Sequence, residues 1–448
     1  MKRTVRLTRP RRTGLVAVAL GVGLATSACN PFGGEPTEHP DWHEPLQVAR
    51  GEAHAGEWRM NDSDFRYVDD PTIALAPNGD AGIAWVDQAR QSLFFRRYDA
   101  DGTARGDAPV EVPSEPGIFS WLPRMVFTDD GTIHVLWQEI IFSGGFHGGE
   151  IMHSRSTDGG ASFSEPTNLS NTTNGAGKGR WSVRVWYNGS LDLAAVSDDT
   201  LYAVWTEYQG TLLVARSTDA GVSWSEPATV FGGEDELPAR GPSLSAGPDG
   251  VIHLAWSVGG ADDADIHYAR SIDRGATFRP STTVHPGDSR ADAPEIAVAA
   301  DGTIHLTWTE RRENPTHAYR VLHASRAPGA TEFGAPRIVS DPLPAGFAGA
   351  RYPYLELDGD GRPHILFELY RDEASYSQGL AIVRSLPGGA FSAPERIPRG
   401  RTVRRAINGS LQGMFMDKLA TTPDGRHFIV NSTFLEGERS AIWLLRSR

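Results

Sequence analysis

Cysteine is nearly absent from this chain of 448 residues, which contains a single one, Cys29. One cysteine excludes an internal disulfide, so no covalent link can stabilise the fold. The sequence also lacks the cysteine and histidine spacings of zinc sites and the glycine-rich loops that bind phosphates. We therefore expect neither a metal site nor a cofactor.

Basic residues are too few to balance the acidic ones. The chain has 43 Lys and Arg against 56 Asp and Glu, a net charge of −13. Six of the basic residues lie among the first 28 positions, so the remainder, with 37 basic and 56 acidic residues, carries −19. An acidic surface of this kind repels a phosphate backbone, which argues against nucleic acid as a partner.

Long apolar runs are missing after residue 28. Before it, a basic start, the apolar stretch 14–25 and the small residues Thr26-Ser27-Ala28 have the organisation of a signal peptide. The apolar stretch is too short for a spanning helix. Small residues directly before Cys29 resemble a bacterial lipobox, in which Thr26 replaces the usual leucine. The resemblance implies cleavage before Cys29 and acylation of that residue.

These features divide the chain into three parts. Residues 1–28 are the predicted signal peptide, 29–42 a Pro-, Gly- and Glu-rich lipid-anchored tether, and 43–448 the folded body. We expect an exported monomer in the bacterial cell envelope that meets the membrane only through its lipid anchor. The alternative is an ordinary signal peptide followed by a chance cysteine.

One sequence pattern recurs through residues 43–448: an apolar strand, a tight turn and a second strand that ends in an aromatic residue. Five clear copies occupy 72–85, 125–137, 244–256, 296–308 and 355–367, and two weaker copies occupy 193–205 and 419–430. Asn-Gly or Asp-Gly between alternating residues is a strong hairpin signal because glycine tolerates positive φ. The copies predict seven repeats of one all-β unit.

A third strand follows each hairpin, and in three units it runs into the same turn. The pattern Ser-x-Asp-x-Gly-x-Ser/Thr-aromatic begins at Ser156, Ser217 and Ser271. The carboxylate of such a turn accepts backbone N–H bonds, and the aromatic ring fills the gap beside the strands. Two incomplete versions of the turn, around 329–333 and 388–391, occur at the same place in the repeat but lack the aspartate.

A short fourth strand follows the first six units, but the seventh unit ends at Arg448 without one. Residues 43–49 carry the missing pattern ahead of the first unit. The sequence therefore predicts a β-propeller of seven four-stranded blades in which the N-terminal strand completes the last blade and closes the ring. Six blades is the alternative if the last unit is irregular.

The aspartate turns, in phase with Trp-ended hairpins, resemble the Asp-box (bacterial neuraminidase) repeats of sialidase-like propellers over residues 43–448. That family implies an exo-α-sialidase activity, with an arginine triad, a Tyr–Glu nucleophile pair and an Asp acid/base. Phe65-Arg66-Tyr67 is similar to the first arginine motif but lacks its Ile-Pro. Tyr352-Pro353-Tyr354, followed by Leu366-Phe367-Glu368, is a partial match to the Tyr–Glu pair.

Arginines recur just before the predicted innermost strands. The guanidinium fork binds carboxylate or sulfate bidentately, so arginines gathered around the axis predict an anionic glycan as partner. The alternative is a set of surface arginines paired with the protein's own acids. The candidate substrate-binding residues are Arg66, Arg240, Arg290 and Arg351, and Arg184, Arg404 and Arg405 occupy similar positions.

Carboxylates recur just after the second strands, at Asp87, Glu139, Glu207, Glu310 and Glu368. Two carboxylates flanking an anomeric carbon can act as acid and nucleophile, although a recurring position more often holds blades together. We take Tyr352, Glu368 and Asp87 as the candidate catalytic residues.

Histidines and exposed aromatics supply further candidates. His134, His253, His305 and His364 share one repeat position, which predicts a packing role. His147 and His317 lie in second-to-third-strand loops and are candidate bases for a lyase. Trp181, Trp186 and Tyr187 are candidates for stacking on sugar rings.

Three functions therefore compete. The first is a sialidase-like exo-glycosidase acting on an anionic sugar. The second is a non-catalytic glycan-binding propeller, with a polysaccharide lyase as a further enzymatic possibility. The third is a protein-interaction scaffold on the cell envelope. The catalytic set is incomplete in sequence, so the sequence leaves open whether the protein is an enzyme.

The lipobox generates a first prediction. Cys29→Ser removes the acylated thiol, so the protein should move from the membrane fraction to the soluble fraction. Fractionation of native-host cells with metabolic labelling by a fatty acid measures this. Wild-type protein that is already soluble and unlabelled would contradict the anchor.

Overall fold

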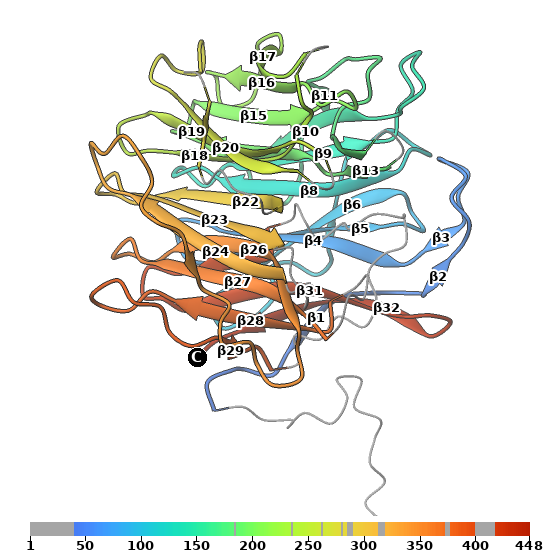
Figure 1. The fold of residues 1–448 in the computed structure, drawn as a ribbon. Helices are drawn as coiled ribbons and strands as arrows, with labels where there is room; N and C mark the ends of the chain where they lie inside the picture. The colour runs from blue at the N-terminus through green and yellow to red at the C-terminus, as the bar shows by residue number, and fades with distance from the viewer. Residues whose placement is uncertain are drawn as a thin grey trace, which may run out of the picture. The chain divides into compact units, whose positions relative to one another are not determined.

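The folded body is a seven-bladed β-propeller (Figure 1). The computed structural model describes residues 40–182, 185–233, 236–260, 263–278, 281–284, 290–311, 319–371, 377–398 and 417–448, which belong to one compact unit, Pro36–Arg448. Within these ranges lie seven four-stranded antiparallel sheets and two short hairpins. No helix among the described residues is long and apolar enough to cross a membrane.

The blades follow one another in chain order. Blade 1 contains β4 (Val68–Leu75), β5 (Ala81–Asp87), β6 (Ser92–Tyr98) and β7 (Val110–Val112). Blade 2 contains β8 (Ser120–Phe127), β9 (Ile133–Glu139), β10 (Glu150–Ser156) and β11 (Thr167–Asn168). Blade 3 contains β14 (Leu191–Ala195), β15 (Leu201–Thr206), β16 (Leu212–Ser217) and β17 (Ala228–Phe231). Blades 4 and 5 contain β18 (Ala239–Ala246), β19 (Ile252–Val258), β20 (Asp265–Ser271), β21 (Thr282–Thr283); and β22 (Arg290–Val298), β23 (Ile304–Arg311), β24 (Tyr319–Arg326), β25 (Arg337–Ile338). Blades 6 and 7 contain β26 (Gly349–Leu357), β27 (Pro363–Tyr370), β28 (Gly379–Arg384), β29 (Glu395–Arg396); and β30 (Leu419–Thr421), β31 (His427–Leu435), β32 (Arg439–Arg446), β1 (Leu46–Gly51).

The N-terminal strand closes the ring, as the sequence predicts. β1 pairs antiparallel with β32, with Leu46 opposite Leu444 and Arg50 opposite Ala441, and Figure 1 shows it within the C-terminal sheet. Trp42 forms a further bridge to Ser447. The sheet order β1-β32-β31-β30 makes the seventh unit a complete blade, which confirms seven blades and excludes six.

The core lies between the blades. The indole rings that end the second strands of blades 2 to 5 are at most 1% exposed: Trp137, Trp205, Trp256 and Trp308. Each hydrophobic cluster joins neighbouring blades; one, for example, contains Ala255 of blade 4 and Trp308 of blade 5. Burying such a ring stabilises the fold by roughly 2–3 kcal/mol, so consecutive blades depend on one another for stability.

The three aspartate turns connect third and fourth strands. In the first, Asp158 Oδ1 accepts a hydrogen bond from the Ser162 backbone N–H at 3.0 Å. Hydrogen bonds, chiefly from the Ser162 hydroxyl, lower the pKa of Asp158 to about 2. The aromatic residue of the turn then packs on the third strand of the preceding blade, with ring centroids 5.4 Å apart for Phe163 and Phe95.

The incomplete turns keep this packing without the aspartate. Phe333 lies 5.3 Å from Tyr268, and Phe391 lies 5.0 Å from His323, measured between ring centroids. The ring-on-blade contact therefore persists where the carboxylate is lost, which explains why the repeat tolerates that loss.

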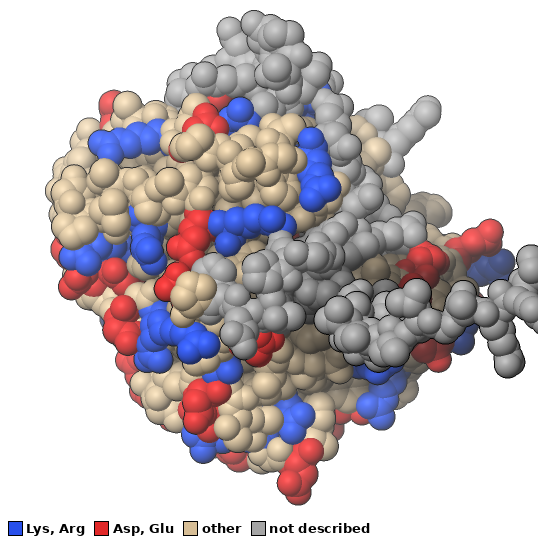
Figure 2. Space-filling view, turned by 90° about the horizontal axis from the view of Figure 1, so that it is seen from below, with Lys and Arg blue, Asp and Glu red and all other residues tan. Residues whose placement is uncertain are grey.

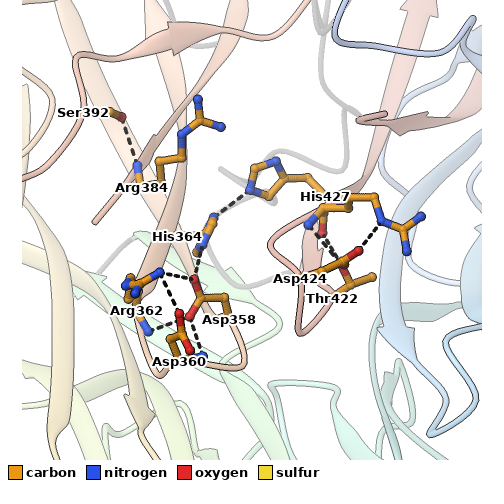
Figure 3. A network of polar contacts seen from close by, with 10 residues as sticks. Asp358, Asp360, Arg362, His364, Arg384, Ser392, Thr422, Asp424 and His427 are labelled. Atoms are coloured by element: carbon orange, nitrogen blue, oxygen red, sulfur yellow. Dashed lines mark hydrogen bonds and ion pairs between the residues drawn. The ribbon is translucent and has the colours of Figure 1, made fainter. Parts of the chain in front are cut away.

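The four repeat histidines pack inside the blades, in line with a structural role. They are at most 8% exposed, and burial lowers the pKa of each. Three of them hydrogen-bond to a ring on the third strand of their own blade; His364 instead pairs with His427 of blade 7 at 2.7 Å. Figure 3 shows this pair between the turns that carry Asp358 and Asp424, so it connects blade 6 to blade 7.

A β-bulge interrupts the innermost strand of five blades near its start. The bulge places a residue in the left-handed region, at φ between 51° and 56°: Asp70, Leu122, Gly241, Ala293 and Tyr352. Bulges bend a strand and turn a side chain in a new direction. They occur at the end of the ring where the predicted site residues lie.

Ring closure generates the second prediction. Deleting residues 43–49 removes most of β1 and exposes the edge of β32, so the melting temperature should fall markedly. Deleting 30–36 from the predicted tether is the control and should leave it unchanged. A melting curve unaffected by the first deletion would show that β1 contributes little to closure.

Candidate functional site

An extra hairpin stands beside the first strands of the blades. β12 (Lys178–Ser182) and β13 (Val185–Asn188) form a two-stranded sheet between blades 2 and 3. Gly179 lies opposite Tyr187, and Arg180 lies opposite Trp186. Since side chains alternate along a strand, the hairpin presents two different faces.

Three of the four predicted substrate-binding arginines come together at this hairpin. The guanidinium carbons of Arg240 and Arg290 lie 5.1 and 4.6 Å from the Trp181 ring. Arg290 donates a 2.7 Å hydrogen bond to the Tyr319 hydroxyl, and the guanidinium of Arg351 lies 3.7 Å from the Tyr319 ring. We call these five residues the arginine cluster. Residues from blades 4, 5 and 6 thus meet through two shared rings.

The members of the cluster differ in what they bind. Arg240 is fully buried, pairs with Asp292 at 3.2 Å and donates to the Gly259 carbonyl, so its charge is already compensated. Arg351 is 9% exposed, and its guanidinium lies between the rings of Tyr319 and Tyr370. In the part of the chain that the structure describes, Arg351 makes no ion pair, and its Nε has no hydrogen-bond acceptor. Burying a charge without a counter-ion costs several kcal/mol, so Arg351 remains a candidate anion-binding group.

Glu368 lies beneath this cluster and is fully buried. Its carboxylate accepts hydrogen bonds from Tyr354 at 3.1 Å, Tyr370 at 2.8 Å and Lys418 at 3.0 Å. Three donors stabilise the ionised form. Burial raises the pKa of Tyr370 well above its usual value, so this tyrosine keeps its proton.

Tyr352 occupies the bulge of blade 6. Its φ of 54° is rare for a bulky residue, and its N–H donates to Thr309 of blade 5 at 2.9 Å. Its ring, 4% exposed, lies 6.3 Å from that of Tyr370. Unusual backbone conformations gather at functional sites, because the surrounding structure must hold them in place.

Two predicted residues lie away from the cluster. Arg66 of β3 (Phe65–Arg66), which pairs with β2 (His54–Ala55), forms exposed ion pairs with Glu52 at 3.0 Å and Asp64 at 3.1 Å. Asp87 ends β5 beside Arg90, and burial raises its pKa. Among the described residues, neither contacts Arg351 or Glu368. Arg184, Arg404, Arg405 and His317 lie outside the described residues.

The other recurring carboxylates have structural partners. Glu139 accepts a 2.9 Å bond from the Trp137 indole, and Glu207 accepts bonds from Thr172 and Asn174. Sequence reasoning missed Tyr319, Tyr370 and the two lysines of the body. Tyr370 follows Glu368 by two residues on one strand, so strand periodicity places both on one face and was the available signal.

The other face of the hairpin contains a buried lysine. Lys178 is 6% exposed and donates a 2.6 Å hydrogen bond to Asn188 Oδ1. Burial lowers its pKa to about 7. Nearby, the His147 ring stacks on Tyr208 with centroids 3.4 Å apart, and burial, with a smaller effect of Lys178, lowers the pKa of His147.

The axis of the propeller is lined by carboxyl groups. A cavity of about 360 Å³ runs between the innermost strands, and its lining includes Asp192, Glu295, Glu356 and Asp417. Arg124 pairs with Asp417 at 2.6 Å. Burial raises the pKa of Glu356 to about 8. No group of three His, Cys, Asp or Glu side chains among the described residues is arranged to hold a metal ion.

Comparison with known proteins gives the fold a context. No family model and no curated protein matches the chain. An ulvan lyase of a polysaccharide lyase family, solved with a GlcA(1-4)Rha3S unit, has a TM-score of 0.55 at 12% identity over 89% of this chain and 95% of its own. The polysaccharide lyase Uly1 has a TM-score of 0.54 at 12% identity over 91% and 99%. At these identities the likeness establishes a shared propeller fold and leaves the reaction open.

The two lysines of the body generate the third prediction. Because the folded state lowers the pKa of Lys178, the unfolded chain binds more protons between pH 7 and 10.5, and this residue destabilises the fold at low pH. Lys178→Met should therefore raise the free energy of unfolding by roughly 1–4 kcal/mol at pH 6, and the gain should shrink as pH rises to 10.

Lys418→Met is the matched control, because Lys418 is equally buried but pairs with Glu368. It should lower the free energy of unfolding by roughly 3–5 kcal/mol, since it leaves a buried carboxylate uncompensated. Urea denaturation at several pH values measures both. Equal losses in both variants would contradict the assigned charge states.

Proposed function

We propose that the protein is a lipid-anchored, exported propeller that binds an anionic glycan at the arginine cluster. The observation that carries the proposal is Arg351: a buried guanidinium between two tyrosine rings, without an ion pair in the described part of the chain. A carboxylate or sulfate of a sugar would supply the missing counter-charge. Arg290, hydrogen-bonded to Tyr319 beside it, would supply a second guanidinium.

Aromatic rings next to these charges favour a sugar over a small inorganic anion. Trp181 and Tyr319 are half-buried, so each presents part of a flat apolar surface to solvent. Such surfaces match the apolar faces of pyranose rings, while the arginines take the acidic substituent. An acidic sugar satisfies both features, whereas phosphate or sulfate alone satisfies only one.

A sialidase-like hydrolysis is the reaction that we propose to test first. The motive is the buried carboxylate Glu368, which holds tyrosine hydroxyls and lies opposite Arg351 in the register of β26 and β27. A tyrosine that transfers its proton to this carboxylate could bond through its oxygen to an anomeric carbon, while the glycosidic C–O bond breaks and the departing oxygen takes up a proton from an acid. Tyr352, at the bulge, is the proposed nucleophile with Glu368 as the proton acceptor; its ring lies 6.3 Å from that of Tyr370, whose hydroxyl donates a hydrogen bond to Glu368. Asp87 lies apart, so the acid that protonates the leaving group is not assigned.

A polysaccharide lyase is the second candidate, and His147 favours it. A lyase needs a base that removes the proton next to a uronate carboxyl group. The lowered pKa of His147 keeps this ring neutral at pH 7, and Tyr208 holds it in place by stacking. Two structures with this fold are described as polysaccharide lyases, one of them with a glucuronic acid–sulfated rhamnose unit bound.

The fourth prediction tests binding and turnover separately. Arg351→Ala should weaken binding of an acidic sugar about tenfold or more, because a charge-assisted contact contributes about 1.5–3 kcal/mol. Arg66→Ala is the control, since Arg66 already pairs with Glu52 and Asp64. Calorimetry with sialosides and oligouronates measures binding, and fluorogenic sialosides measure hydrolysis.

Tyr352→Phe and His147→Ala then separate the reactions. Loss of sialoside turnover in Tyr352→Phe with binding unchanged supports the hydrolase. Loss of unsaturated product from uronate chains in His147→Ala supports the lyase. Binding that depends on Arg351 without any turnover supports a non-catalytic glycan-binding protein. If Arg351→Ala changes no glycan interaction, the proposed function is wrong and a protein-interaction scaffold becomes the better account.

A further inference from the structure

The second face of the hairpin carries two cations that lack acidic partners. Lys178 and Arg180, opposite Asn188 and Trp186, share one face of the hairpin, whereas Gly179 and Tyr187 share the other, where the Tyr187 ring packs against Trp181 of the arginine cluster. Lys178 Nζ binds the amide oxygen of Asn188 at 2.6 Å, and Arg180 Nη1 lies 3.4 Å from the amide oxygen of Gln209. Within the described residues, neither cation forms an ion pair with a carboxylate. We call Lys178 and Arg180 the lysine face.

Some cations elsewhere on this acidic protein pair with carboxylates, and others bind backbone carbonyls, as Arg96 binds Gly106 and Arg155 binds Ala220. Arg97 and Arg105 both pair with Asp80, at 3.0 and 3.2 Å, and Arg362 pairs with Asp360 at 2.8 Å. In the view of Figure 2, basic side chains lie interspersed with acidic ones. Lys178 and Arg180 differ in that both lie on one strand of the hairpin, and Lys178 is buried there with an amide as its hydrogen-bond partner.

Aromatic rings border the lysine face, as they border the arginine cluster. Trp186 is 37% exposed and lies opposite Arg180 on the hairpin. Its ring is 5.2 Å from Tyr208 and 5.4 Å from His147, both in edge-on orientation. The Arg180 guanidinium lies 5.9 Å from the Tyr208 ring. Cations with neutral partners and a partly exposed indole again suit a sugar with an acidic substituent.

We infer that the hairpin separates two anion-binding subsites, the arginine cluster and the lysine face, and that the ligand is a glycan chain with acidic groups on at least two of its sugars. The inference rests on the proposed function and narrows its substrate class. A single terminal acidic sugar would fill the arginine cluster and leave Lys178 and Arg180 without a counter-charge. A chain that crosses the hairpin supplies an anion to each side.

Lysine at position 178 adds a property that arginine would not. The body contains two lysines, Lys178 and Lys418, and otherwise uses arginine. Arginine keeps its proton at all physiological pH values, whereas a buried lysine can lose its proton. The described neighbours that bear on this charge are the amide of Asn188, the His147 ring and Arg180 on the same strand. An acidic sugar on the lysine face would favour the protonated amine, so chain binding should weaken as pH rises above 7.

The fifth prediction uses chain length. The purified protein is titrated with oligouronates of one, two and four acidic sugars at pH 6 and pH 8.5. Wild-type affinity should rise at least about tenfold from one to four sugars at pH 6 and less at pH 8.5, as expected for linked sites. Arg180→Gln and Lys178→Met should abolish most of this gain and leave binding of the single sugar unchanged. Arg337→Gln, at an exposed arginine of the outer strand β25, is the control and should keep the gain.

The outcomes separate the two proposals. If the single sugar binds through Arg351 but affinity does not rise with length, or the rise survives in Arg180→Gln and Lys178→Met, the second subsite is wrong and the proposed function stands. If no oligouronate or sialoside binds and Arg351→Ala has no effect, the proposed function itself fails. Trp186→Ala provides an independent check, because loss of the stacking surface should reduce the gain without changing any charge.

Discussion

Pairing between β1 and β32 is the interaction on which the architecture depends. Each blade packs only on its two neighbours, so a ring with one incomplete blade would leave an unpaired strand edge and weaken the apolar contact beside it. The pairing joins residues almost 400 positions apart in sequence, Leu46 and Leu444 among them. With the ring closed, the first strands of all seven blades begin around one axis, and loops from distant parts of the chain meet there.

The candidate site arises where the repeat is modified at that end of the ring. Four blades place Asp, Leu, Gly or Ala at the bulge of the first strand, whereas blade 6 places Tyr352 there. The hairpin β12–β13 is a second departure, inserted between blades 2 and 3. Trp181, from this hairpin, contacts arginines of blades 4 and 5. Positions that recur in every blade stabilise the propeller. Among the described residues, Tyr352 and the hairpin β12–β13 do not recur, and they give this end of the ring side chains that the other blades lack.

Buried cations of this protein differ in whether a carboxylate compensates their charge. Arg124 and Arg240 are buried with aspartate partners and hold blades together. Arg351 and Lys178 are buried beside rings and amides, without an ion pair in the described part of the chain. Burying a cation without a carboxylate partner lowers the stability of the fold. Proteins keep such destabilising groups mainly where function requires them.

Repetition is why the amino-acid order alone predicted so much of the fold. Hairpins with Asp-Gly turns, Trp-ended second strands and a displaced fourth strand at the N-terminus depend on local periodicity, so they led to seven closed blades. The gathering of Arg240, Arg290 and Arg351 was also foreseeable, because each recurs near the start of its unit, where the structure places the beginning of the innermost strand. Local pattern could not show that Arg66 pairs with Glu52 and Asp64, that Arg240 is neutralised by Asp292, or that Glu368 binds Tyr354, Tyr370 and Lys418. Arg240–Asp292 and Glu368–Lys418 join different blades, 52 and 50 positions apart in the chain, and the contacts closer in sequence depend on how the loops and strands fold. Partner choice depends on which side chains three-dimensional packing brings within hydrogen-bonding distance, and periodicity along the chain carries no information about that distance.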